Sequence, residues 1–159
     1  MAPQSASGDG ARGHVLPFPS RSRERSTSEE TKGPTKQLTI LIVEDHNSLC
    51  EMLSLYFIRL GYHVRTATDG ERALEIIASE EIHLVLLDLM LPRLDGFTVL
   101  KQLRESAGQR TPYVIVVSAG ASERDRNKVL ELGANEYMPK PFHLARLIER
   151  IRAVEKHLL

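Results

Sequence analysis

The segment VLLDLMLPRLDGF, residues 85–97, joins a run of aliphatic residues to one aspartate and ends in a second aspartate followed by glycine. The run belongs to IHLVLL, residues 82–87, which is nearly continuously apolar, as is typical of a strand covered on both faces of a parallel sheet. Asp88 then marks the end of this strand. Asp95 instead predicts a helix N-cap, since aspartate accepts hydrogen bonds from the free backbone donors there.

Alternating strand and helix patterns surround this segment from Gln37 onward. Strands are expected at 38–43, 62–66, 82–87, 113–117 and 135–138, and helices at 47–60, 71–79, 96–106, 122–132 and 143–157. Alternation of this kind demands a parallel sheet with helices on both faces, an α/β fold of the (βα)5 type. In the first helix we expect a core-facing stripe of Leu49, Met52, Leu53, Tyr56, Phe57 and Leu60.

The chain length of 159 residues fits one domain with an extension. Residues 1–36 are rich in Ser, Gly, Pro and Arg, so we interpret them as a disordered N-terminal extension and 37–159 as the folded domain. The basic run SRSRERS, residues 20–26, could be a nucleic-acid or lipid patch, but nearby glutamates favour a solvated tail. With 21 basic and 21 acidic residues, direct nucleic-acid binding is not expected.

Targeting signals for export or membrane insertion are not evident. The N-terminus lacks the apolar core of a secretory signal, and no stretch approaches the length of a membrane span. Cys50 is the only cysteine, which fits a reducing compartment. We therefore expect a cytoplasmic protein without membrane insertion.

Polar residues stand at four of the five expected strand ends. They are Glu44 and Asp45 after the first strand, Asp88 after the third, Ser118 after the fourth, and Tyr137 to Lys140 along the fifth. Ligands of open α/β sheets bind at this edge. Three carboxylates brought together would repel one another unless they hold a cation, and all-oxygen ligands favour Mg²⁺. His46 adjoins the acids, but a bystander role is favoured.

The expected group of side chains has the chemistry to receive a phosphoryl group. Mg²⁺ and the Lys140 ammonium would neutralise the phosphoryl oxygens, while the Ser118 hydroxyl would donate to another. Asp88 would be the nucleophile and form an aspartyl phosphate. Because neither GxxxxGK nor GxGxxG occurs, the phosphoryl group is expected to come from another molecule.

Four motifs resemble the receiver domain of two-component response regulators. They are ILIVEDH (40–46), VLLDLMLPRLDGF (85–97), VIVVSAG (114–120) and GANEYMPKPF (133–142). The resemblance implies a flavodoxin-like fold with strand order 2-1-3-4-5. It also implies that Asp88 accepts phosphate from a phosphohistidine on a histidine kinase or phosphotransfer protein. Such a protein is not an enzyme in the usual sense, although it catalyses its own phosphorylation and dephosphorylation.

The resemblance also assigns roles to individual residues. Glu44, Asp45 and Asp88 match the Mg²⁺ ligands, completed by the backbone carbonyl of Met90, whose side chain would lean over the site. Ser118 and Tyr137 match the residues that switch when the acceptor is phosphorylated. Lys140 matches the lysine that pairs with the phosphoryl group, and the bond that follows it, to Pro141, would be cis.

Signalling is expected to occur through partner binding, because no output motif follows the last helix in this sequence. We therefore expect a stand-alone receiver of the chemotaxis or phosphorelay type, a monomer or weak dimer. The family implies a partner face on the fourth helix, fifth strand and fifth helix. Two alternatives remain open, a phosphorylation-independent interaction module and a metal-dependent phosphatase. Met90 disfavours the phosphatase, because it stands where such enzymes usually carry a second acid.

Overall fold

The computed structural model describes residues 36–106, 108, 111–120 and 122–159. The expected disordered extension, residues 1–36, lies outside the described residues except for Lys36. The strands are β1 (Thr39–Val43), β2 (His63–Ala67), β3 (Leu84–Leu87), β4 (Tyr113–Ala119) and β5 (Glu136–Lys140). The helices are α1 (Asn47–Arg59), α2 (Gly70–Ser79), α3 (Gly96–Ser106), α4 (Glu123–Glu131) and α5 (Leu144–Leu158).

The five strands form one parallel sheet in the order β2-β1-β3-β4-β5. The predicted fold class, flavodoxin-like with strand order 2-1-3-4-5, is confirmed. Each crossover between strands carries a helix, because parallel neighbours cannot be joined by a tight turn. Consequently the carboxyl ends of all five strands meet at one edge, and the loops at that edge bring together residues that are distant in sequence.

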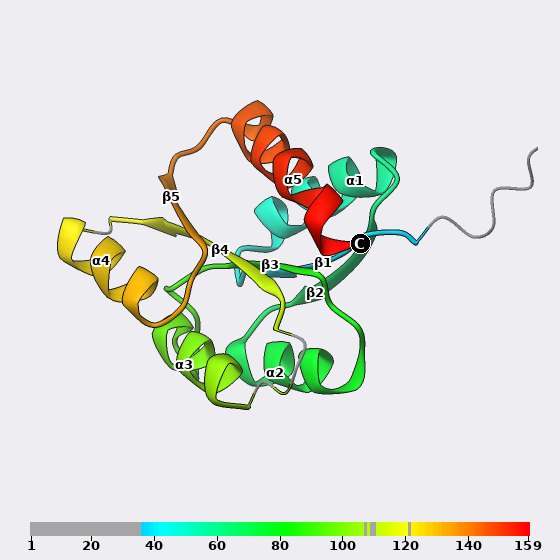
Figure 1. Cartoon of the computed structure of the whole chain (residues 1–159). Helices are drawn as coiled ribbons and strands as arrows, with labels where there is room; N and C mark the ends of the chain where they lie inside the picture. The colour runs from blue at the N-terminus through cyan, green and yellow to red at the C-terminus, as the bar shows by residue number, and fades with distance from the viewer. Residues whose placement is uncertain (1–35, 107, 109–110, 121) are drawn as a thin grey trace, which may run out of the picture. The chain divides into compact units, whose positions relative to one another are not determined.

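Helices cover the sheet on both faces. Figure 1 shows α1 and α5 on one face, and α2 and α3 on the other. The first face packs around Phe57, Leu147 and Ile151, each 0% exposed, and the second includes Val99 and the α4 residue Val129. Burying one such side chain contributes about 1.5–3 kcal/mol, so the central strands are held firmly from both sides.

The core-facing stripe of α1 differs from the one expected. Leu53 and Phe57 are buried with Cys50, whereas Met52 and Tyr56 are 46% and 43% exposed. At about 100° per residue, these two positions lie on the edge of the stripe that turns away from the sheet. The prediction that Met52 and Tyr56 belong to the core was therefore wrong, because the helix contacts the sheet through a narrower arc.

The helix starts carry side-chain caps where the sequence offers them. Asp95 accepts a hydrogen bond from the Thr98 amide at 2.9 Å, which confirms its role at the start of α3. Ser122 and Asp125 form a reciprocal capping box at the start of α4. Within the described residues, none of the helices has the length and apolar character needed to cross a membrane.

Candidate phosphoryl-acceptor site

The register of the central strands places the acidic residues side by side. Val43 of β1 lies opposite Leu87 of β3, so the residues that follow them, Glu44 and Asp88, leave the sheet together. The Asp88 amide donates to the Val43 carbonyl at 3.0 Å and extends this pairing by one residue. The parallel sheet thus fixes the backbone of Asp88 relative to the acids after β1.

Three carboxylates converge at this edge. Oxygens of Glu44, Asp45 and Asp88 all lie within 4.8 Å of one another. Glu44 and Asp88 are only 4% and 6% exposed, while Asp45 is exposed. Because water screens the buried pair poorly, the cluster carries an excess of negative charge that a hard divalent cation would neutralise. The donor set therefore fits Mg²⁺.

Among the described residues, Lys140 supplies the single cation that contacts the cluster. Its Nζ donates to Glu44 Oε2 at 2.6 Å and to Asp88 Oδ2 at 3.2 Å. Burial alone would lower the pKa of this ammonium, but the hydrogen bond to Glu44 and the charge of Asp88 outweigh that effect, so the pKa is raised. Lys140 is thus held charged beside Asp88. The bond from Lys140 to Pro141 is cis, as predicted.

Backbone amides complete the hydrogen bonding of the two buried acids. The His46 amide donates to Glu44 Oε1 at 3.1 Å, and the Met90 amide donates to Asp88 Oδ1 at 3.1 Å. The His46 side chain caps α1, with Nδ1 accepting from the Leu49 amide. The Met90 side chain is 71% exposed. Metal binding through the Met90 carbonyl stays a prediction.

Ser118 and Tyr137 occupy the neighbouring strands β4 and β5. Ser118 is 1% exposed near the end of β4, and its strand partner in register is Pro139. The Tyr137 hydroxyl donates to the Ser118 carbonyl at a long 3.5 Å. The structure therefore brings both predicted switch residues into contact, while their roles stay predictions.

The loop that follows Asp88 is held by a close glycine contact. A Cβ on Gly96 would lie 2.5 Å from the Asp88 carbonyl oxygen and 2.6 Å from the Leu89 Cα, both backbone atoms. The Gly96 amide donates to the Leu89 carbonyl at 3.0 Å. Only glycine fits this position without displacing the backbone of Asp88.

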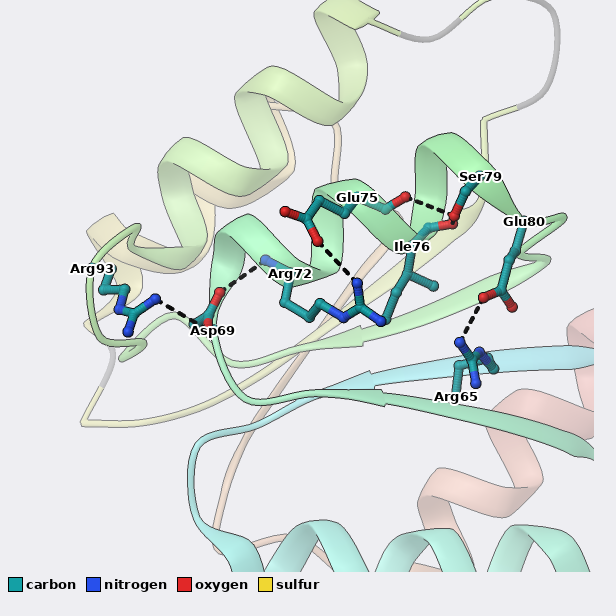
Figure 2. Close-up of polar contacts among 8 residues, drawn as sticks. All are labelled: Arg65, Asp69, Arg72, Glu75, Ile76, Ser79, Glu80 and Arg93. Atoms are coloured by element: carbon teal, nitrogen blue, oxygen red, sulfur yellow. Dashed lines mark hydrogen bonds and ion pairs between the residues drawn. The ribbon is translucent and has the colours of Figure 1, made fainter.

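The same loop is also linked to α2. Figure 2 shows Arg93 reaching toward Asp69, with Arg93 Nη1 4.0 Å from Asp69 Oδ2. Asp69 itself caps α2 by accepting from the Arg72 amide at 2.8 Å. Arg93 has a φ of 65°, an uncommon conformation for a residue other than glycine. Pro92, which precedes it, favours a turn of this kind.

Sequence reasoning placed the site residues but did not identify these supporting ones. Asp95 was predicted as a helix N-cap, yet the contact between Gly96 and the Asp88 carbonyl depends on how the loop folds back. The signal for Arg93 was the preceding proline, which favours a left-handed residue next in a turn. Its pairing with Asp69 joins two loops far apart in sequence, so no local pattern could reveal it.

Fold and site together define a flavodoxin-like α/β domain with an acidic, metal-compatible centre at the carboxyl edge of its sheet. The family model of the response regulator receiver domain matches residues 40–152. The chain therefore belongs to the receiver domains of two-component response regulators, which work in phosphorylation-based signalling.

Similar proteins include both curated relatives and solved structures. Response regulator MprA of Mycolicibacterium vanbaalenii is 44% identical over 115 residues, covering 72% of this chain and 49% of MprA. The Francisella response regulator 1452 receiver domain is 29% identical with a TM-score of 0.72, covering 77% of this chain and all (100%) of that one.

A third similar chain comes from a complex. The co-crystal structure of the Saccharomyces cerevisiae histidine phosphotransfer protein Ypd1 and the receiver domain of Ssk1 matches with 26% identity and a TM-score of 0.69, covering 75% of this chain and 91% of that one. This chain spans about half the length of the curated relatives that it matches.

Proposed function

We propose that Asp88 accepts a phosphoryl group from a phosphohistidine on a histidine kinase or a histidine phosphotransfer protein. The observation that carries this proposal is the cluster of Glu44, Asp45 and Asp88, with carboxylate oxygens within 4.8 Å and Lys140 bridging two of them. The co-crystallisation of Ypd1 with the Ssk1 receiver supports a phosphotransfer partner of this class.

In the proposed transfer, an Asp88 oxygen forms a bond to phosphorus while the bond from phosphorus to the histidine nitrogen breaks. The released imidazole takes up a proton. Lys140, which is already 3.2 Å from Asp88 Oδ2, would then pair with a phosphoryl oxygen, and Ser118 would donate from β4. Mg²⁺ held by Glu44, Asp45, Asp88 and the Met90 carbonyl would neutralise the oxygens in transfer.

Phosphorylation would signal by shifting the population between two surface states. The Ser118 hydroxyl moving toward the phosphoryl group would change the contact between Tyr137 and the Ser118 carbonyl, and Tyr137 would turn inward. The readout would be a protein partner bound on α4, β5 and α5. In the alternative, a phosphorylation-independent module, partner affinity would be unchanged by Asp88→Asn.

The direct test is labelling with acetyl phosphate in the presence of Mg²⁺, followed by mass spectrometry of the acid-labile adduct. We expect one phosphoryl group on Asp88, no adduct with Asp88→Asn, and no labelling after chelation. Asp95→Asn is the matched control, because Asp95 is an exposed acid in the same loop that caps α3. An adduct that persists in Asp88→Asn would overturn the proposal.

Two further parts of the proposal concern the protein in the cell. We expect a cytoplasmic receiver that is monomeric or weakly dimeric. Immunoblotting of cell fractions would give its location. Sedimentation of the purified protein would give its oligomeric state, and a tight dimer would contradict the proposal.

A further inference from the structure

Met90 has the most exposed of the large apolar side chains in the part of the chain that the structure describes. It is 71% exposed, and it stands between Leu89, which is 4% exposed, and Leu91, which packs against the core. Met90 itself belongs to neither of the two core clusters. Its thioether is therefore open to water, and a chemical change to it should cost the fold little.

The backbone of Met90 holds this exposed side chain beside the acidic cluster. Its amide donates to Asp88 Oδ1 at 3.1 Å, and the Asp88 amide is in turn bonded to the Val43 carbonyl at 3.0 Å. Only the side chain of Met90 separates its sulfur from the amide that makes this contact. The thioether is thus a neighbour of the carboxylate that Lys140 contacts at 3.2 Å.

The other sulfur atoms of the described residues are buried or lie elsewhere. Cys50 is 8% exposed, and burial raises the pKa of its thiol, so little reactive thiolate is present. Met138 of β5 is 7% exposed. Met52 is 46% exposed, but it lies on the edge of α1 that turns away from the sheet. Among these described residues, only Met90 combines exposure with a place beside Asp88.

We propose that Met90 is a site of reversible oxidation by hydrogen peroxide, and that its sulfoxide shortens the lifetime of a phosphoryl group on Asp88. The sulfur forms a bond to one peroxide oxygen, and the bond between the two peroxide oxygens breaks. The departing hydroxide takes the proton left on the transferred oxygen and becomes water. The sulfur is thereby oxidised by two electrons, and the peroxide is reduced by two.

Oxidation changes how the side chain of Met90 interacts with water. A thioether is a weak acceptor, so it holds water poorly and shields the phosphorus atom. A sulfoxide is polar, and its oxygen would hold a water molecule by accepting one of its protons. The water oxygen would then form a bond to phosphorus while the bond from phosphorus to Asp88 breaks, which restores the carboxylate and releases inorganic phosphate. This second part of the inference rests on the proposed function, because only a phosphorylated Asp88 has a lifetime to change.

The first measurement concerns the modification itself. The full chain is treated with hydrogen peroxide, and peptide mapping by mass spectrometry gives the fraction of sulfoxide at each methionine over time. We expect Met90 to be oxidised well before Met138, and methionine sulfoxide reductases to restore it. Oxidation of Met90 no faster than that of Met138 would overturn the inference, whether or not Asp88 can be labelled.

The second measurement concerns the phosphoryl group. Oxidised and untreated chains are labelled with acetyl phosphate and Mg²⁺, the reagent is removed, and loss of the adduct on Asp88 is followed by intact-protein mass spectrometry. We expect oxidation to speed hydrolysis by about fivefold, the effect of one net hydrogen bond. Unchanged or slower hydrolysis would overturn the inference.

Three variants assign the effect to its residue. Met90→Leu keeps an apolar side chain of similar volume that peroxide does not oxidise, so its rate of hydrolysis should not respond to peroxide. The matched control is Met52→Leu, which removes another exposed methionine and should respond as the natural chain does. Met90→Gln carries an acceptor oxygen permanently and should speed hydrolysis without peroxide, which tests the mechanism even if peroxide damages other residues. A response to peroxide in Met90→Leu as large as in the natural chain would overturn the inference.

Failure of the proposed function can be told apart from failure of this inference. No labelling of Asp88 in the untreated chain would overturn the proposed function and the effect on lifetime together, while the peptide map would still decide whether Met90 is the oxidised site. Normal labelling with a lifetime that peroxide leaves unchanged would overturn only the inference about Met90.

Discussion

The two ends of β5 hold polar clusters of opposite character. At the carboxyl end, Lys140 contacts Glu44 and Asp88, with Asp45 close by, so in the part of the chain that the structure describes three carboxylates meet one cation. At the amino end, Glu136 accepts hydrogen bonds from Arg150 Nε and Nη2 and a third from the Tyr113 hydroxyl at 2.6 Å. The carboxyl-end cluster is unbalanced, because its carboxylates outnumber its cation. The amino-end cluster is matched, because one carboxylate pairs with one guanidinium.

The pKa values in the amino-end cluster reflect the pairing of one carboxylate, Glu136, with one guanidinium, Arg150. The hydrogen bonds from Arg150 lower the pKa of Glu136 despite its partial burial. Burial, together with the hydrogen bond to Glu136, raises the pKa of Tyr113 to about 12. The carboxylate thus stays charged and the phenol stays neutral across the ordinary pH range. A matched cluster joins α5 to β4 and β5, whereas an unbalanced one is suited to receive a cation and an oxyanion.

The largest difference between the two ends of β5 is expected in the rate of labelling by acetyl phosphate when the cation at each end is replaced. Lys140→Ala removes the ammonium that contacts Asp88, the proposed acceptor, and we expect the rate of labelling by acetyl phosphate to fall by about 10²–10³. Arg150→Ala removes a cation of the matched cluster and should leave the rate unchanged. Intact-protein mass spectrometry over time measures the rate of labelling in both variants. An equal fall in rate in Lys140→Ala and Arg150→Ala would show that the two ends of β5 do not differ in this respect.

Replacing one acid at each end of β5 should show how each cluster contributes to the free energy of unfolding. Glu136→Gln weakens a bidentate pair and should lower the free energy of unfolding by about 1–2 kcal/mol. Glu44→Gln relieves repulsion among three carboxylates, so in metal-free buffer the free energy of unfolding should be unchanged or higher. Urea titrations measure both values.

The exposed acid Glu149 on α5 gives the control for these titrations, and Glu149→Gln should leave stability unchanged. A cost for Glu44→Gln as large as that for Glu136→Gln would show that the carboxyl-end cluster is stabilising as it stands.

Adding Mg²⁺ should stabilise the natural chain through the unbalanced end alone. At ten times its dissociation constant, a ligand specific to the folded state raises the free energy of unfolding by about 1.4 kcal/mol. Thermal melts with and without Mg²⁺ should show this shift in the natural chain and in Glu136→Gln. A shift of the same size in Asp88→Asn combined with Glu44→Gln would indicate binding elsewhere.

The smallest effect is expected for Tyr113→Phe, which removes one hydrogen bond at the matched end. At neutral pH it should cost about 1 kcal/mol or less. Because the pKa of Tyr113 is raised on folding to about 12, its contribution is complete below its ordinary value near 10 and is lost as pH rises toward 12. The difference in stability between the natural chain and Tyr113→Phe should therefore shrink over this range.

Much of this architecture follows from short sequence patterns. Continuous aliphatic runs gave the buried strands, and the acids directly after β1 and β3 gave the carboxyl-end cluster, because parallel strands end at a common edge. The amino-end cluster was not foreseen. Tyr113, Glu136 and Arg150 belong to three elements, and their contact depends on the register of β4 with β5 and on the rotation of α5, which local patterns do not encode.

The helix surface was the weakest part of the sequence interpretation. The apolar residues of α1 occupy a wider arc of the helix surface than the arc that contacts the sheet. Periodicity alone therefore assigned Met52 and Tyr56 to the core. Both remain in contact with solvent. Cys50 is buried, although the expected stripe did not include it.

The close approach of Gly96 to Asp88 would limit the direction in which a phosphorylation signal leaves the proposed site. The Asp88 carbonyl abuts Gly96, and the Asp88 amide is tied to Val43, so the end of β3 has little freedom to move. A phosphoryl group added to the side chain would therefore act outward, on the neighbouring strands. We expect β4 and β5 to shift on phosphorylation, while β3 stays in place.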